Sequence, residues 1–119
     1  MSRFKHLFEP IKIGPVEVQN RICHVPTDIS SSHIDGSVSE RDIHHQSEIA
    51  KGGTGFIIVG ATAPEGKTGR STVTNLVIDD DNYIPGFARL ASAMHRYGAK
   101  CAIQLNHPGR QAALRGKAN

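Results

Sequence analysis

The stretch CAIQLNHPGRQ, at residues 101–111, begins with a mostly apolar segment that contains one glutamine, Gln104. The sequence His-Pro-Gly-Arg follows this segment. By strand alternation, Gln104 points to the opposite face from Ile103 and Leu105. Its amide offers one acceptor and two donors, which suit the edge of a heterocycle carrying ring N–H and C=O groups. The spacing alone leaves a second interpretation open, in which Gln104 bonds only to neighbouring backbone or water.

Arg110 is the second candidate, since it follows His107, Pro108 and Gly109 in what reads as a loop. Its guanidinium would contact an anionic group of a substrate or anchor the loop by hydrogen bonds, and both interpretations stay open. The seven histidines show no ligand spacing with a third partner, so no metal site is predicted. Cys23 and Cys101 form no Cys-x-x-Cys motif and are predicted to be small buried side chains.

Two phosphate-binding motifs are excluded by their spacing. The tripeptide at residues 66–68, GKT, would need a glycine at position 61 to complete a Walker A loop, and the chain has Ala61 there. A dinucleotide-binding fingerprint should follow the first strand, but the stretch PTDISSSHIDGS contains one glycine. A Rossmann-type nucleotide site is therefore not expected.

Length and composition indicate one domain-sized unit without a strongly charged surface. The chain has 119 residues, 38% of them hydrophobic, with 14 Lys and Arg against 11 Asp and Glu. No run of like charges indicates a nucleic-acid or membrane surface, so neither partner is expected. No apolar stretch is long enough for a membrane span, and the N-terminus lacks a signal core, so a cytoplasmic location is predicted.

Four strand-like segments are predicted. Residues 11–20 alternate apolar and polar side chains around Gly14-Pro15, which is typical of a β-hairpin. The segment RICHV, at residues 21–25, is a short strand that Pro26 ends. The run GFIIVGA, at residues 55–61, lacks alternation, which favours a strand covered on both faces, and residues 100–105 form the last strand.

Two helices are predicted between these strands. The first helix begins at Ser39-Glu40-Arg41-Asp42, a sequence that resembles a capping box. It has a thin apolar face and ends at Gly52-Gly53. The stretch at residues 62–75 is rich in Gly, Pro, Ser and Thr and is predicted to be a loop. Asp80 or Asp81 caps the second helix, which ends at Gly98 and has these apolar residues at spacings of three and four: Ile84, Phe87, Leu90, Ala91, Met94 and Tyr97.

The order hairpin, strand, helix, strand, helix, strand favours parallel strands joined by right-handed crossovers, hence an α/β fold. An open doubly wound sheet and the beginning of a (β/α)₈ barrel both remain possible, although the missing nucleotide fingerprint weakens the first. A closed barrel needs about 250 residues. Residues 1–119 are therefore predicted to be a single partial domain, with a hairpin at 11–20 and the first βαβαβ units at 21–119.

Several motifs in order resemble the N-terminal third of the old yellow enzyme family of flavin oxidoreductases, with its dienoyl-CoA reductase and trimethylamine dehydrogenase relatives. The resemblance covers residues 7–111 and rests on these elements: Leu7-Phe8 with Pro10, Asn20-Arg21, Pro26, the GFIIVGA strand, and Gln104 with His107-x-Gly109-Arg110. It implies the N-terminal part of a (β/α)₈ TIM barrel with an N-terminal hairpin, truncated after the third strand.

The family binds FMN at the carboxyl mouth of its barrel. The resemblance implies that the backbone at Pro26 and Thr27, the small residues Gly60 and Ala61, and the Gln104 amide meet the isoalloxazine ring. This implication favours the flavin interpretation of Gln104.

Asp28 departs from the family pattern, since relatives often have Cys or Thr there and trimethylamine dehydrogenase has its flavin-linked cysteine. A covalent flavin is therefore not expected. Because a carboxylate near the ring would disfavour an anionic reduced flavin, Asp28 is expected to turn outward or to contact a cationic substrate.

The resemblance implies hydride transfer from NAD(P)H through FMN to an activated alkene, or the reverse dehydrogenation of a small molecule. The family's catalytic residues are expected beyond residue 119, as is any iron–sulfur cluster of a longer parent, so the isolated chain is predicted to be inactive. Self-association through the exposed barrel edge is expected. The alternative is a non-catalytic fragment or assembly subunit that completes a barrel with a second chain.

Overall fold

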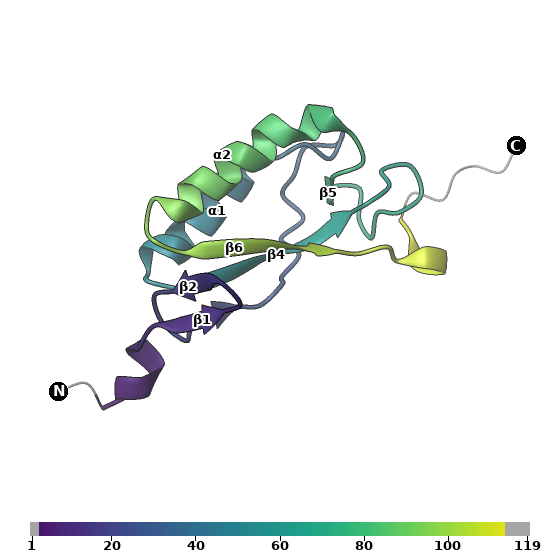
Figure 1. Cartoon of the computed structure of the whole chain (residues 1–119). Coiled ribbons are helices and arrows are strands. Elements are labelled where there is room, and N and C mark those ends of the chain that lie inside the picture. Colours follow the sequence, from purple (N-terminus) through teal and green to yellow (C-terminus); the bar gives the residue numbers. More distant parts are fainter. Residues whose placement is uncertain (1–2, 114–119) are drawn as a thin grey trace, which may run out of the picture.

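Strand β4 (Phe56–Ala63) is the centre of a parallel sheet in the computed structural model, which describes residues 3–113. Strand β6 (Lys100–Leu105) pairs along one whole edge of β4, from Phe56 to Thr62. Strands β3 (Cys23–His24) and β5 (Leu76–Val77) therefore share the other edge, β3 at the start of β4 and β5 at its end. All pairs are parallel, so the carboxyl ends of the strands meet at one edge of the sheet (Figure 1).

The predicted hairpin is confirmed as β1 (Ile11–Ile13) paired antiparallel with β2 (Val16–Val18). Gly14, in the two-residue turn, has φ +58°, a conformation that glycine adopts without strain. The hairpin follows a 3₁₀ helix, η1 (Lys5–Phe8), and lies at the amino ends of the parallel strands (Figure 1). Asn20, two residues after β2, joins the end of the hairpin to the turn between α1 and β4, because its Nδ2 donates to the Gly53 carbonyl oxygen at 2.6 Å.

The structure corrects the prediction that residues 62–75 are all loop. Strand β4 runs two residues further than expected, to Ala63, and Thr62 and Ala63 pair with Leu76 and Val77 of β5. The order of strands and helices thus contains one strand that the sequence did not predict. The two residues of β5 are buried, at 6% and 0% exposed, which explains why a polar loop returns to the sheet at this point.

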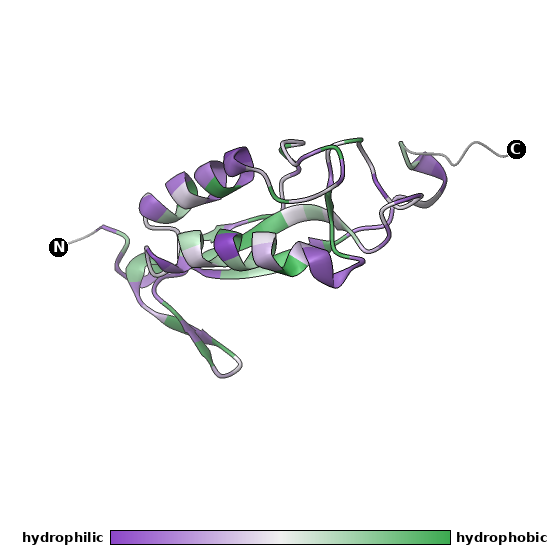
Figure 2. Cartoon of the chain, turned by 90° about the horizontal axis from the view of Figure 1, so that it is seen from above, coloured by the Kyte–Doolittle hydropathy of each residue, from purple (hydrophilic) through white to green (hydrophobic). Residues whose placement is uncertain are grey.

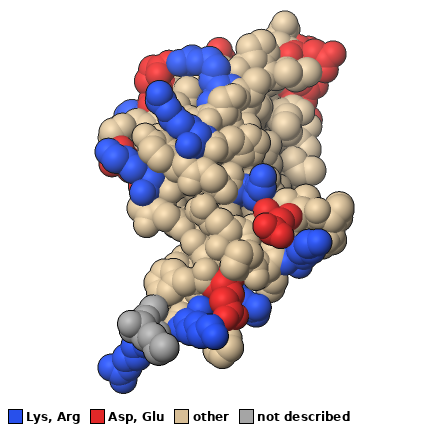
Figure 3. All heavy atoms as spheres, turned by 60° about the vertical axis from the view of Figure 1, so that its left-hand side comes forward, with Lys and Arg blue, Asp and Glu red and all other residues tan. Residues whose placement is uncertain are grey.

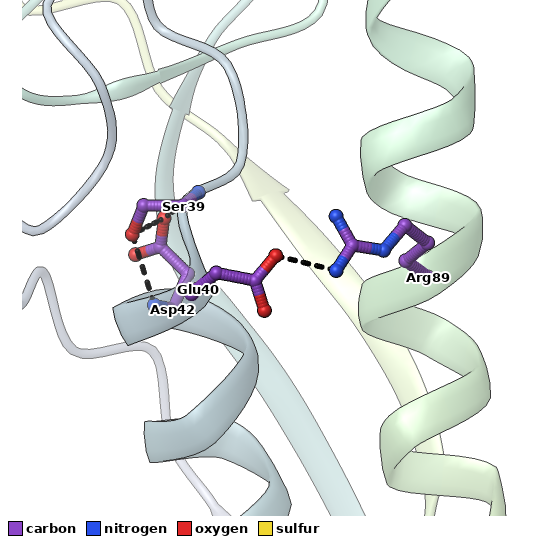
Figure 4. A network of polar contacts seen from close by, with 4 residues as sticks. All are labelled: Ser39, Glu40, Asp42 and Arg89. Atoms are coloured by element: carbon purple, nitrogen blue, oxygen red, sulfur yellow. Dashed lines mark hydrogen bonds and ion pairs between the residues drawn. The ribbon is translucent and has the colours of Figure 1, made fainter.

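Helix α1 (Glu40–Lys51) begins with the predicted capping box (Figure 4). The Ser39 hydroxyl accepts from the Asp42 amide at 3.1 Å, and Asp42 Oδ2 accepts from the Ser39 amide at 2.8 Å. These bonds satisfy two amides that the first turn would leave unpaired. Glu40 also pairs with Arg89 of the other helix, but both side chains are exposed, so the pair contributes little to stability.

Helix α2 (Ile84–His95) follows a 3₁₀ turn, η2 (Asp81–Tyr83), that Asp80 caps by accepting from the Asn82 amide at 2.8 Å. Leu90 and Met94 are buried as predicted. The prediction is wrong for the two end residues of the apolar face, because Ile84 is 58% exposed and Tyr97 lies beyond the end of the helix.

The core lies between the sheet and the two helices, which cover the same face (Figures 1 and 2). Ile57 and Val59 point to the helices and are at most 4% exposed. By alternation Phe56 and Ile58 point to the opposite face, where they are only half-buried. The expectation of a strand covered on both faces is therefore met on the helix side alone.

No helix within residues 3–113 is long and apolar enough to cross a membrane. On the face of the molecule drawn in Figure 3, basic and acidic side chains are interspersed.

Leu90→Ala is expected to lower the free energy of unfolding by about 2–5 kcal/mol, because Leu90 is 1% exposed and its truncation leaves a cavity. Ile84→Ala, on the same helix, is the control and should cost less than about 1 kcal/mol, since it removes an exposed side chain. Urea denaturation followed by circular dichroism measures both. Equal losses would contradict this assignment of the core.

Candidate functional site

The candidate site is the edge of the sheet where the parallel strands end. It combines the segment after β3, the end of β4 and the end of β6, which contribute Thr27, Ala61 and Gln104. The family resemblance implied that these three residues meet at the carboxyl mouth of the barrel. In parallel α/β folds this edge is where ligands bind.

A β-bulge in β4 shapes the centre of this edge. Val59 pairs with Ile103 and Thr62 with Leu105, so Gly60 and Ala61 together stand opposite a single residue of β6, Gln104. Ala61 has φ +38°, a left-handed conformation that is uncommon for a residue with a side chain. A bulge interrupts the ladder and leaves a backbone group without its strand partner.

Gln104 replaces the missing ladder bond. Its Oε1 accepts from the Ala61 amide at 3.3 Å, so the side chain of β6 supports the strained residue of β4. This contact matches the interpretation in which Gln104 bonds to neighbouring backbone. Within the described residues, no hydrogen bond uses Gln104 Nε2, and the side chain is exposed on the face opposite the helices. The ligand-binding interpretation of Gln104 therefore stays a prediction.

Gly60 is required by a close backbone contact. A Cβ at this position would lie 2.5 Å from the Thr27 carbonyl carbon and oxygen, which no packing tolerates. The segment after β3 therefore lies directly against the end of β4. This contact explains the glycine through backbone packing, whereas the sequence suggested that it admits a flat ring.

Asp28 is held within a network of loop residues. Its Oδ1 accepts from the Ser30 amide at 2.8 Å and its Oδ2 accepts from Asn75 Nδ2 at 2.7 Å. Asn75 is 2% exposed, and its Oδ1 accepts from the Ser71 and Thr72 amides at 2.6 and 2.9 Å. Asp28 thus joins the loop after β3 to the loop after β4. Its proposed contact with a cationic substrate stays a prediction.

Sequence reasoning missed Asn75 and Arg70, which organise the loop between β4 and β5. Arg70 is 9% exposed, and its guanidinium donates to the carbonyl oxygens of Gly66 and Val73, at 2.9 and 3.1 Å, and of Ile34. Polar residues are ordinary in loops, so no sequence signal distinguished these two. The same loop is joined to the end of β6, because Asn106 Nδ2 donates to the Ser71 hydroxyl at 2.9 Å.

The turn after β6 lies beside this loop. His107 Nδ1 accepts from the Gly109 amide at 3.1 Å, and a Cβ on Gly69 would lie 2.9 Å from the His107 ring. Arg110 is exposed in the 3₁₀ helix η3 (Gly109–Gln111). Residues 3–113 contain no group of three His, Cys, Asp or Glu side chains placed to hold a metal ion.

The loop carboxylate Glu65 has a pKa below its usual range. The hydroxyl and amide of Thr68 donate to it, and the Lys67 amide adds a further bond at 2.8 Å. These bonds favour the ionised form over the protonated one.

The comparisons with known proteins agree with this architecture. The model of the NADH:flavin oxidoreductase / NADH oxidase family matches residues 6–119. The chain belongs to this family. The predicted resemblance to old yellow enzymes is thereby confirmed, although residues 114–119 lie outside the part of the chain that the structure describes.

Two curated members of the family are similar in sequence. The chain is 40% identical to the NADH oxidase of Thermoanaerobacter brockii over 111 residues, covering 93% of the chain and 17% of that protein. It is also 40% identical to the NADPH dehydrogenase of Bacillus subtilis over 113 residues, covering 94% and 33%. The chain therefore spans between about one sixth and one third of the length of these family members.

Solved structures of the family are similar in fold. A 2-naphthoyl-CoA reductase in complex with 2-naphthoyl-CoA superposes with a TM-score of 0.84 and 30% identity, covering 92% of this chain and 16% of that one. The old yellow enzyme from Pichia sp. AKU4542 gives a TM-score of 0.82 and 26% identity, covering 90% and 28%. The described residues thus have the fold of one part of these larger proteins.

Asn75→Ala is expected to lower the free energy of unfolding by about 1–3 kcal/mol, because it leaves two loop amides without their acceptor. Asn82→Ala, an exposed asparagine in η2, is the control and should change it by less than about 0.5 kcal/mol. Chemical denaturation measures both variants, and limited proteolysis should cleave the Asn75 variant faster after Arg70. Equal stability of the two variants would show that the network does not hold the loop.

Acid is expected to release the turn at Glu65. The folded-state pKa lies below the ordinary value of 4.5, so the stabilisation is fully present above pH 4.5 and is lost as the pH falls through the lowered value. The amide chemical shifts of Lys67 and Thr68, followed by NMR against pH, should report this titration. In Glu65→Gln these amide shifts should show no such titration step. An unchanged step in that variant would show that another group titrates.

Proposed function

We propose that this chain supplies the first βα units of an FMN-binding barrel that passes hydride from NAD(P)H to an activated alkene, or catalyses the reverse dehydrogenation. The exposed Gln104 amide beside the bulged Ala61, at the carboxyl edge of the parallel sheet, is the observation that supports the proposal most strongly. The relatives named NADH oxidase and NADPH dehydrogenase support the choice of reductant.

The chemistry of the edge fits a flavin. Bound FMN supplies the ability to accept and donate hydride, and the protein supplies binding and orientation. A flat ring requires small residues and backbone groups at its face and hydrogen-bonding groups at its edge. Ala61 and the backbone at Pro26 and Thr27 provide the first, and the Gln104 amide provides the second.

Each residue has a distinct role in the proposed site. Gln104 Nε2 donates to an acceptor atom of the ring while its Oε1 keeps the Ala61 amide in place. Gly60 allows the Thr27 backbone to approach, so that both segments form one continuous surface. Asp28 supports this surface indirectly, because its bonds to Ser30 and Asn75 hold the loop that contains Thr27.

The catalytic groups are proposed to lie outside residues 3–113. Polarisation of an alkene substrate and protonation of its carbon need acids or donors above the ring. The Gln104 amide oxygen, the Ser71 hydroxyl and the Asp28 carboxylate at this edge are instead occupied by hydrogen bonds within the protein. A location of the catalytic groups outside residues 3–113 agrees with the small share of the relatives' length that the chain spans.

Titration of the purified chain with FMN, followed by flavin fluorescence, tests the proposal. The wild-type chain is expected to quench the fluorescence with a defined stoichiometry. Gln104→Leu should weaken binding about 10-fold, corresponding to roughly 1.4 kcal/mol for one lost hydrogen bond. Gln19→Leu, on the segment that contacts residues 53 and 54 at the opposite end of the strands, is the control and should bind like wild type. Saturable binding that Gln104→Leu leaves unchanged would overturn the proposed site.

The open edge of the sheet favours a second candidate function, that of a subunit that completes a barrel with another copy or another chain. Within the described residues β6 pairs only with β4, which leaves its other edge exposed. A groove of about 260 Å³ lies beside it, lined by apolar side chains that include Phe87, Met94 and Ile103. Unpaired strand edges next to apolar surface are sites of association.

Sedimentation velocity of the chain alone measures this association. Leu105 is 64% exposed on the edge strand, so Leu105→Lys is expected to shift the population toward monomer by adding charge at that edge. Ile34→Lys, at a residue 80% exposed in the loop between β3 and α1, is the matched control and should leave the distribution unchanged. A wild-type chain that stays monomeric at high concentration would exclude self-association.

A further inference from the structure

Helix α1 buries two polar side chains beside its apolar ones. Asp42, Gln46 and Ala50 are spaced four residues apart, which places them on one face, and they are 3%, 2% and 0% exposed. A helix normally buries an apolar stripe against its sheet. Buried polar groups require hydrogen-bond partners, so each of the two polar side chains needs an explanation.

Asp42 has its partners within the protein. Its Oδ2 accepts from the Ser39 amide at 2.8 Å, and its Oδ1 accepts from the Ser31 hydroxyl. The carboxylate thus closes the first turn of the helix and holds the loop after β3 against it.

Gln46 lacks such a partner. Within the described residues its Oε1 is buried and accepts no hydrogen bond from the protein. An amide oxygen in this position has lost its contact with bulk water without a replacement, and a buried group of this kind is typically satisfied by an ordered water molecule.

A small cavity lies beside Gln46. Its volume is about 10 Å³, and its lining combines residues of α1, of β4 and of the two loops at the carboxyl edge. This volume corresponds to about one water molecule. The polar side chains around it include Ser30, Ser31, Asp42 and Thr74, so a water would have further partners there.

We propose that this cavity binds a single ordered water molecule that donates to Gln46 Oε1. The water completes the hydrogen bonding of the helix face and joins α1 to the loops after β3 and β4. A cation is a poorer match, because the carboxylates of Asp28 and Asp42 that line the cavity are both occupied by donors of the protein. The proposal does not depend on flavin binding.

A crystal structure of the chain at about 1.5 Å resolution tests this site. The expected result is one density peak in the cavity, about 2.8 Å from Gln46 Oε1 and within hydrogen-bond distance of at least one further polar atom. An empty cavity, a protein donor on Gln46 Oε1, or a peak with oxygen contacts near 2.4 Å as for a metal ion would each overturn it.

The variant Gln46→Leu adds a second measurement, because it removes the acceptor but retains a side chain that fills space. Its crystal structure should lose the peak. His45→Leu changes the neighbouring exposed position of the same helix and should retain it. A peak that persists unchanged in Gln46→Leu would show that Gln46 is not the partner of the water, which contradicts the proposal.

Discussion

The parallel register of β4 with its neighbours is the constraint on which the rest of the structure depends. Since β3, β5 and β6 all run in the direction of β4, their carboxyl ends meet at one edge. The extra residue at Gly60-Ala61 then turns the backbone of β4 at that edge, and Gln104 compensates the lost ladder bond. The β-bulge therefore both requires the Gln104 bond to the Ala61 amide and shapes the candidate binding surface.

The loops at this edge are joined to one another by buried or partly buried side-chain hydrogen bonds. Asn75 and Arg70 are buried and use their polar groups on loop backbone, while Asp28 and Asn106 join the loops that follow β3 and β6 to the loop after β4. A surface that presents backbone groups to a flat ring needs such support, because small displacements weaken binding and orientation.

Periodicity predicted much of this arrangement. The bounds of β6 and the face of Gln104 follow from alternation, and the capping box located the start of α1. Strand β5 was missed because a run of three apolar residues after a polar loop, of which two form the strand, is too short to show a period. The burial of Asp42 and Gln46 was also missed, since a polar helix face reads as solvated unless its partners in distant loops are known. Asn75 gave no signal because its role depends on Asp28, which lies 47 residues away.

The proposed function requires that FMN contact the carboxyl edge of the sheet and no other surface. NMR chemical-shift mapping of the isotopically labelled chain during addition of FMN tests it most directly. The largest changes are expected at the amides of Thr27 and Ala61 and at the Gln104 side-chain amide, while the β1–β2 hairpin at the other end should stay unchanged. Changes centred on the hairpin, or spread evenly over the chain, would contradict it.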